Sequence, residues 1–389
     1  IGRKRLMTLG ICMEATAVFT FGFIDFLEDK QLYFIISYCS RLLMGIGLTG
    51  FGTASYAFAA AHYPEQLMEK IAMIELYAGL GLMAGPIFGA GVYSIGGYVS
   101  VFISLGSLFF GLVPYLWKYI PEDKPYIKPE VQVSYFSLLK IRRVFLSFLV
   151  PTFTIAGIAS IEPTLQPHLL KYGLSNEVAA ACFIIGTVSY SMVMPVVNKF
   201  PAHWDRRIII CIGVFLAAIC QFFMGPTPGL MPSKLWITIL GLFIQGYGCA
   251  IALIPVMPEM LKVAAPHFPQ AKDDLSDRIS GMLSAGFALG NLFGPWIGGY
   301  FADIYGFPWG ATLIGVITAV FLVVLLTIGG GFCAFRTCLK RNVADDHYVE
   351  APDTLNTSLK TEDGGIEFSE QFKKSTYASI STEASETAQ

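Results

Sequence analysis

The stretches GLGLMAGPIFGAG at residues 79–91 and ALGNLFGPWIGG at residues 288–299 repeat nearly the same glycine–proline phrase. Five residues in and just after the first stretch recur around the second at a constant offset of 209 residues. The matched pairs are Gly81 with Gly290, Gly85 with Gly294, Pro86 with Pro295, Gly89 with Gly298, and Gly97 with Gly306. Because all five are residues that perturb helices, matches at one offset indicate an internal duplication.

The spacing of the phrase predicts a slender helix with one smooth face. Glycines four residues apart lie on the same side of a helix, and a neighbouring helix can approach such a face closely. Proline removes one backbone hydrogen bond and kinks the helix. We therefore expect a gating or helix-packing role, with tight static packing as the alternative. The residues concerned are Gly81, Gly85, Pro86, Gly89, Gly290, Gly294, Pro295 and Gly298.

The composition is that of a membrane protein. The 389 residues are 54% hydrophobic and 14% charged, and the mean hydropathy is +0.60, whereas a soluble domain carries about 25% charged residues. No phosphate-binding loop, catalytic triad or clustered metal-ligand pattern is present in the sequence. We therefore expect a protein that is not an enzyme, with no cofactor, no bound metal and no nucleic-acid partner.

Ten apolar segments are long enough to cross a bilayer, which takes about 20 residues as a helix. Their length excludes barrel strands, so they predict an all-α membrane protein. The segments are 6–26, 31–60, 71–95, 98–119, 144–168, 178–198, 207–226, 234–258, 279–303 and 308–335.

The basic residues give the segments an orientation. When alternate connections are assigned to opposite sides of the membrane, 22 of the 26 Lys and Arg residues, including those of the C-terminal tail, fall on one side. Three fall on the other side, and Arg41 lies inside a segment. The positive-inside rule makes the first side cytosolic, so the tail is expected in the cytosol.

The duplication also predicts the domain organisation. Four segments precede the longest cytosolic connection and six follow it, whereas parallel repeats of six helices are a known transporter architecture. We therefore expect an N-terminal bundle at 1–119 lacking its first two helices in an N-terminally incomplete chain. After this bundle we expect a cytosolic central loop at 120–143, a six-helix bundle at 144–335 and a disordered cytosolic tail at 336–389.

Several motifs resemble those of the major facilitator superfamily. The stretch from Gly81 to Gly89 is similar to the antiporter motif of its fifth helix, and the stretch from Gly2 to Arg5 to the loop motif between helices two and three. The stretch from Arg41 to Gly47 is similar to the motif of helix four. The resemblance implies two pseudo-symmetric helical bundles, with about ten of twelve transmembrane helices present in this chain.

Within that superfamily the sequence resembles the vesicular amine transporters, solute carrier family 18, and most of all the polyamine branch. The stretches that carry this resemblance are Glu75–Gly81, Glu162–Leu165, Gly225–Pro226 and Ile254–Glu259. It implies proton-coupled antiport of an organic cation into an acidic organelle. Monoamine and acetylcholine members carry aspartates where Ala250 and Ser284 stand here, so a polyamine or another cation fits better than a classical neurotransmitter.

Two glutamates inside the spans are candidate substrate or proton sites, because a charge at the bilayer centre costs about 2.5–3.5 kcal/mol. Glu162 is followed by Pro163, so we expect a distorted helix there and a carboxyl that alternates between a proton and an ammonium group. The alternative is a structural hydrogen bond. Glu75 lies near the expected cytosolic end, where a merely interfacial position is the alternative.

Arg41 and Glu14 complete the candidate set. The resemblance implies a role for Arg41 in proton coupling, with a snorkelling anchor as the alternative. Glu14 lies in the middle of the first segment. Tyr77, Tyr190 and Tyr247 are candidates for cation–π contacts with the substrate, with ordinary packing as the alternative.

The sequence thus predicts a transporter whose partners are a small organic cation, protons and the lipid bilayer. We expect a monomer in a vesicle or endomembrane, or in the plasma membrane. Export of drugs or other small solutes is one alternative function. A non-transporting membrane receptor or scaffold that acts through its tail is the other.

Overall fold

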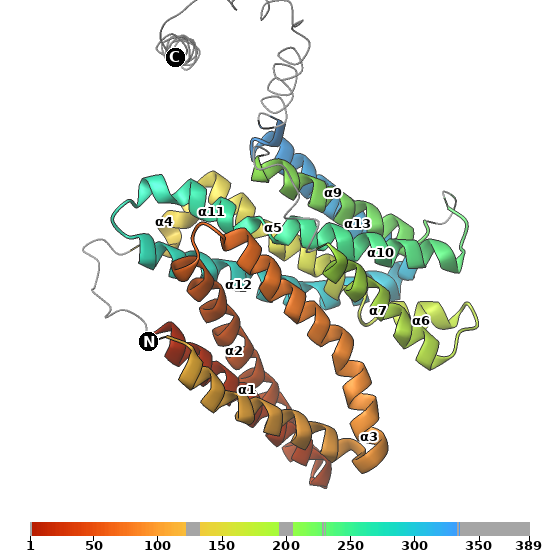
Figure 1. Ribbon diagram of the computed structural model, residues 1–389. Coiled ribbons are helices and arrows are strands. Elements are labelled where there is room, and N and C mark those ends of the chain that lie inside the picture. Colours follow the sequence, from red (N-terminus) through yellow and green to blue (C-terminus); the bar gives the residue numbers. More distant parts are fainter. Residues whose placement is uncertain are drawn as a thin grey trace, which may run out of the picture. The chain divides into compact units, whose positions relative to one another are not determined.

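The computed structural model describes residues 2–121, 133–193, 205–227, 229, 231–332 and 334, and all regular structure among them is helical (Figure 1). The expected all-α class is therefore confirmed. The elements are α1 (Arg3–Phe23), η1 (Ile24–Phe26), α2 (Lys30–His62), α3 (Leu67–Tyr119), α4 (Tyr135–Lys140), α5 (Arg142–Ala159), α6 (Leu165–Leu170), α7 (Asn176–Met192), α9 (Arg206–Met224), α10 (Leu235–Leu253), α11 (Val256–Ala264), η2 (Ala265–His267), α12 (Lys272–Tyr305) and α13 (Phe307–Thr327).

The described residues include seven helical stretches long and apolar enough to cross a membrane. The ten segments expected from the sequence are helical over most of their described residues, with breaks at residues 160–164, 254–255 and 328–330. The segments 71–95 and 98–119 share the label α3, but the backbone leaves helical geometry at Gly97 between them, so they are two helices, as expected. Helix α4 lies inside the expected central loop, and the expected tail at 336–389 lies outside the described residues. The domain boundaries stay a prediction.

Helix α3 folds back on itself at Gly97, where the backbone leaves helical geometry with φ of 72° (Figure 1). Its C-terminal arm then packs along α1. Gly306, the matched residue of the second phrase, has φ of 80° and separates α12 from α13. Helix α1 contacts α2 and α3, and α9 contacts α10 and α13. The two copies of the repeat therefore share both a turn and a packing pattern.

The two glycine faces differ in their neighbours. The face at Gly290, Gly294 and Gly298 packs against α5, and a Cβ built at Gly294 lies 2.7 Å from the carbonyl oxygen of Ala156. A Cβ built at Gly81 or Gly85 meets no described atom within 4 Å.

At the third glycine of the first face, a built Cβ meets only Val101, at 4.0 Å from Gly89. Pro86 and Pro295 both lie inside helices that continue through them. The role of the second face in close packing has a structural basis, and the role of the first stays a prediction.

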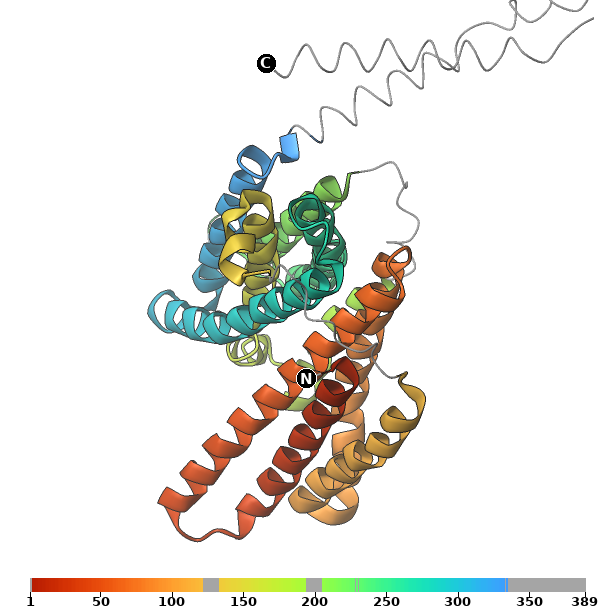
Figure 2. The ribbon, with the colours of Figure 1, turned by 90° about the vertical axis from the view of Figure 1, so that its left-hand side faces the viewer.

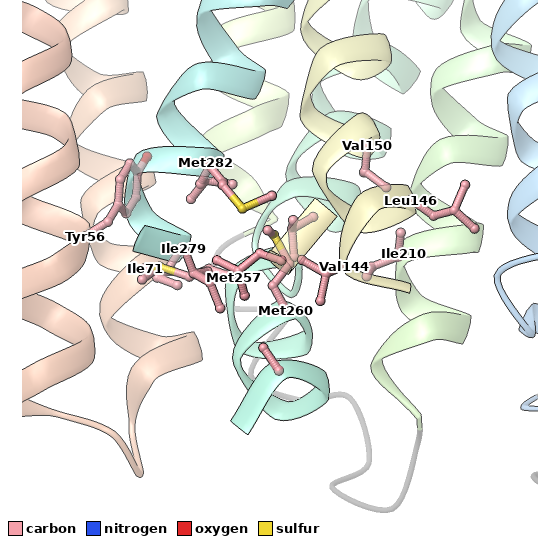
Figure 3. Close-up of a cluster of buried hydrophobic side chains, with 14 of the residues drawn as sticks. Tyr56, Ile71, Val144, Leu146, Val150, Ile210, Met257, Met260, Ile279 and Met282 are labelled. Atoms are coloured by element: carbon pink, nitrogen blue, oxygen red, sulfur yellow. The ribbon is translucent and has the colours of Figure 1, made fainter. Parts of the chain in front are cut away.

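Helices α1–α3, which we call the first half, meet helices α4–α13, the second half, through α2 with α12 and α3 with α7. One hydrophobic cluster continues across this boundary, from Tyr56 and Ile71 to Met257, Ile279 and Met282 (Figure 3). We call this region the closed end. Figure 2 shows that α1 and α2 extend beyond it, away from the second half.

Candidate functional site

Glu162 lies in a break between two helices. Helix α5 ends at Ala159, α6 begins at Leu165, and the intervening residues form turns that include Pro163. The distortion expected next to this proline is therefore present. The side chain of Glu162 is exposed and has no hydrogen-bond or ion-pair partner among the described residues. Its carboxylate is free to receive a ligand.

The break frees the backbone carbonyl of Gly157, because the amide of Ile161 donates to Ile158 instead, at 3.2 Å. The carbonyl oxygen of Gly157 accepts hydrogen bonds from the Ser160 hydroxyl at 2.8 Å, the Gln221 side-chain amide at 2.9 Å and the Gln245 side-chain amide at 3.4 Å. Both glutamines are buried. Since an unsatisfied buried carbonyl is costly, these amides stabilise the break that carries Glu162.

Glu75 is buried, with 8% of its surface exposed, and both of its carboxylate oxygens are engaged. Oε1 accepts a hydrogen bond from the hydroxyl of Tyr56 on α2 at 2.5 Å. Oε2 accepts one from the hydroxyl of Tyr190 on α7, also at 2.5 Å. The expected alternative of a merely interfacial glutamate does not describe this position, because Glu75 joins the first half to the second.

The contacts of the two tyrosines differ from what the sequence indicated. Tyr190, a candidate for cation–π contact, donates to Glu75. Tyr56, which sequence analysis missed, also stacks on Phe287 of α12, with 6.3 Å between ring centroids. Tyr77 is 71% exposed. A tyrosine in an apolar span was the available signal for Tyr56, but nothing in the sequence paired it with Glu75.

Arg41 and Glu14 lie elsewhere. The guanidinium of Arg41 is exposed and lies over the ring of Phe21, 4.3 Å from its centroid. Glu14 is half-buried. Among the described residues, no hydrogen bond or ion pair joins Glu14, Arg41, Glu75 and Glu162 to one another. The structure therefore does not gather the four candidates into one constellation.

Two further polar contacts cross between the halves at the closed end. Arg3 of α1 pairs with Asp277 of α12 at 2.7 Å. Thr53 of α2 donates to the hydroxyl of Ser284 on α12, also at 2.7 Å. Burial raises the pKa of Asp277 even though the hydrogen bond and charge of Arg3 act in the opposite direction. Together with Glu75 and Tyr190, these pairs hold the closed end together.

No group of three or more metal-ligating side chains lies together in the part of the chain that the structure describes.

The sequence matches a known family model and several curated proteins. Residues 1–272 match the model described as Major Facilitator Superfamily. The chain is 27% identical over 324 residues to the mouse MFS-type transporter SLC18B1, an alignment that covers 82% of this chain and 70% of that protein. It is 23% identical over 329 residues to the mouse synaptic vesicular amine transporter, covering 82% of this chain and 60% of that protein.

Solved structures show the same fold. The human organic anion transporter MFSD10 superposes with a TM-score of 0.63 at 17% identity, covering 83% of this chain and 77% of that one. The proton:xylose symporter XylE superposes with a TM-score of 0.64 at 12% identity, covering 83% of this chain and 79% of that one. At these identities the likeness concerns the fold alone.

Proposed function

Because the chain belongs to the major facilitator superfamily, we propose that it is a proton-coupled antiporter of organic cations. The fold of this transporter family consists of two pseudo-symmetric helical bundles, and the protein is not an enzyme. The finer proposal is that it exchanges lumenal protons for a cytosolic amine or polyamine across a vesicle membrane. The closed end then faces the cytosol, and the halves alternate in access around a central site.

The observation that carries the proposal is the position of Glu162. An unpartnered carboxylate in a helix break offers a cation an ionic partner within an otherwise apolar span. A protonated amine and a proton compete for the same carboxylate, which is the chemistry that exchange requires. Arg41 is the only lysine or arginine of the expected spans that does not lie at or next to a span end, so an organic cation suits the site better than an anion.

The relatives support the same substrate class. One set is named synaptic vesicular amine transporter and aligns over 82% of this chain. Amines are cations at neutral pH, and two acidic candidates, Glu162 and Glu14, have no cationic partner among the described residues. Ala250 and Ser284 stand where monoamine and acetylcholine members of the family carry aspartates. This difference favours a polyamine over a monoamine as the substrate.

The proposal is tested by flux in reconstituted vesicles. An outward-directed proton gradient should drive uptake of labelled spermidine by the protein, and Glu162→Gln should abolish the uptake. Glu65→Gln removes a carboxylate from the exposed turn between α2 and α3 and serves as the matched control. Absence of gradient-driven uptake by the unmodified protein, or undiminished uptake and affinity in Glu162→Gln, would refute the proposal.

A further inference from the structure

The buried carboxylate of Glu75 is held by one phenol from each half of the protein. Tyr56 donates to one oxygen from within the first half, and Tyr190 donates to the other from the second half. A Cβ built at Gly79, one turn further along α3, lies 2.7 Å from the hydroxyl of Ser191. Helices α3 and α7 therefore lie close together near this hydrogen bond.

We propose that Glu75, Tyr56 and Tyr190, together the Glu75 site, form a second proton site, separate from Glu162, that closes the cytosolic side when Glu75 is deprotonated. The inference rests on the proposed antiport. It identifies the Glu75 site as the contact between the two halves that depends on the proton. Glu162 binds the organic cation, whereas protonation of Glu75 changes the contact between the two halves.

The groups around Glu75 explain why its charge state matters. Tyr56 reaches it from α2 and Tyr190 from α7, and Cys249 of α10 lies within electrostatic range of Tyr190. No lysine, arginine or histidine forms an ion pair with Glu75 among the described residues. A buried carboxylate without a cation depends on its hydrogen-bond donors, so the two phenols are its whole support.

Protonation changes the hydrogen-bonding capacity of the site. An ionised carboxylate only accepts, and here it accepts one phenol on each oxygen. A protonated carboxyl carries one O–H donor and loses the stronger, charge-assisted form of both bonds. A proton added to Glu75 therefore weakens the Tyr190–Glu75 hydrogen bond, which among the described residues is the one hydrogen bond between α3 and α7, and loss of the proton restores it.

The other contacts at the closed end do not depend on this proton. Arg3 with Asp277 and Thr53 with Ser284 join α12 to α1 and α2, and Phe287 of α12 stacks on Tyr56. Among the described residues, the Glu75 site thus supplies the hydrogen bond that holds α7 to the first half, beside the apolar packing of Ala72 and Leu76 near Tyr190. Loading a proton releases α7 from α3, which fits an exchanger that opens to the cytosol with a proton bound.

Hydrogen exchange in nanodiscs tests the site without requiring transport. After correction for intrinsic rates, the backbone amides of residues 67–79 and 183–192 should exchange faster at acidic than at alkaline pH in the unmodified protein. Tyr190→Phe should exchange about tenfold faster at alkaline pH, since it removes one hydrogen bond to a charged group. Glu75→Gln should exchange fast at every pH. Tyr93→Phe, on the same helix and exposed, should behave as the unmodified protein does.

A transport measurement separates this inference from the proposed function. Glu75→Gln should lose uptake driven by the proton gradient, because its cytosolic side no longer closes when the proton leaves. If the unmodified protein transports no spermidine, the proposed function fails, and the pH dependence of hydrogen exchange still tests the Glu75 site. Two results would overturn the inference. One is hydrogen exchange in both Glu75→Gln and Tyr190→Phe that equals that of the unmodified protein. The other is gradient-driven uptake retained in Glu75→Gln.

Discussion

Gly97 and Gly306 share a backbone conformation that side chains rarely adopt, although 209 residues separate them. The torsion angles are φ 72° and ψ −164° at Gly97, and φ 80° and ψ 159° at Gly306. Each glycine ends a helix that carries the glycine–proline phrase and begins an apolar helix that returns across the unit. This region of torsion space is essentially restricted to glycine, so both turns require the residue found there.

Alanine at either turn should therefore destabilise the protein. We expect Gly97→Ala and Gly306→Ala each to lower the free energy of unfolding by about 1–3 kcal/mol, the usual cost of such backbone strain. Thermal melting in detergent measures the effect. Gly91→Ala, in the helical part of α3 with no described atom within 4 Å of its built Cβ, is the control and should be neutral or stabilising. Equal melting temperatures for all three variants would contradict the expectation.

The contact between α12 and α5 makes a second prediction with its control one residue away. A Cβ built at Gly298 lies 2.6 Å from Cβ of Ser160, whereas one built at Gly299 meets nothing within 4 Å. Gly298→Leu should cost about 1–3 kcal/mol of stability through overpacking and should reduce transport, because Ser160 begins the break that carries Glu162. Gly299→Leu should retain both. A fall in melting temperature for Gly299→Leu as large as that for Gly298→Leu would count against the argument.

Much of the fold was predictable because its signals are local. Hydropathy located the helices, and the constant offset of glycines and prolines located the repeat, since these residues act on their own turn of backbone. The turn between the expected segments 71–95 and 98–119 was also predictable, because Gly97 stands between them and the backbone leaves helical geometry there. Helix α4 was missed within a segment that is polar on average.

The candidate site was predictable only in part. Glu162 and Glu75 stand out as acidic residues in apolar surroundings, so composition alone identifies them. The residues that hold Glu75 and the helix break do not stand out, because Tyr190 is 115 residues from Glu75 and Gln221 is 64 residues from Gly157. Such pairs depend on how the helices pack, which no single stretch of sequence encodes. The two glutamines inside apolar segments were the available signal that a backbone carbonyl needed donors.

A capping aspartate outside the membrane spans gives a prediction about pH. Asp205 accepts a hydrogen bond from the backbone amide of Arg207 at 3.1 Å and pairs with the Arg207 guanidinium. Burial alone would raise the pKa of Asp205, but the hydrogen bonds and charge of Arg207, with the charge of Lys262, outweigh it and lower the pKa below the usual 3.8. A lowered folded-state pKa stabilises the protein above the unfolded-state value.

Asp205→Ala should therefore lower stability at neutral pH by about 1 kcal/mol, the typical cost of losing an N-cap. The part due to ionisation should shrink as the pH falls below about 4, through the folded-state pKa, because the unmodified protein then loses the charged pair as well. Chemical unfolding at a series of pH values measures the difference. Asp303→Asn, an exposed aspartate of α12, is the control. A stability difference that grows on acidification would show the wrong sign.

The helix break at Glu162 makes the last prediction. Gln221 donates to the Gly157 carbonyl at 2.9 Å and is 1% exposed, whereas Gln245 donates to the same oxygen at 3.4 Å. Gln221→Leu should cost about 1 kcal/mol, the net value of a typical hydrogen bond, and Gln245→Leu should cost less because the longer bond is weaker. If the glutamines position Glu162, Gln221→Leu should also raise the KM for spermidine more than it lowers the maximal rate. A loss of stability with an unchanged KM would show that Gln221 only supports packing. Identical effects of the two substitutions would contradict the argument from hydrogen-bond length, since only the donor–acceptor distance distinguishes the two glutamines.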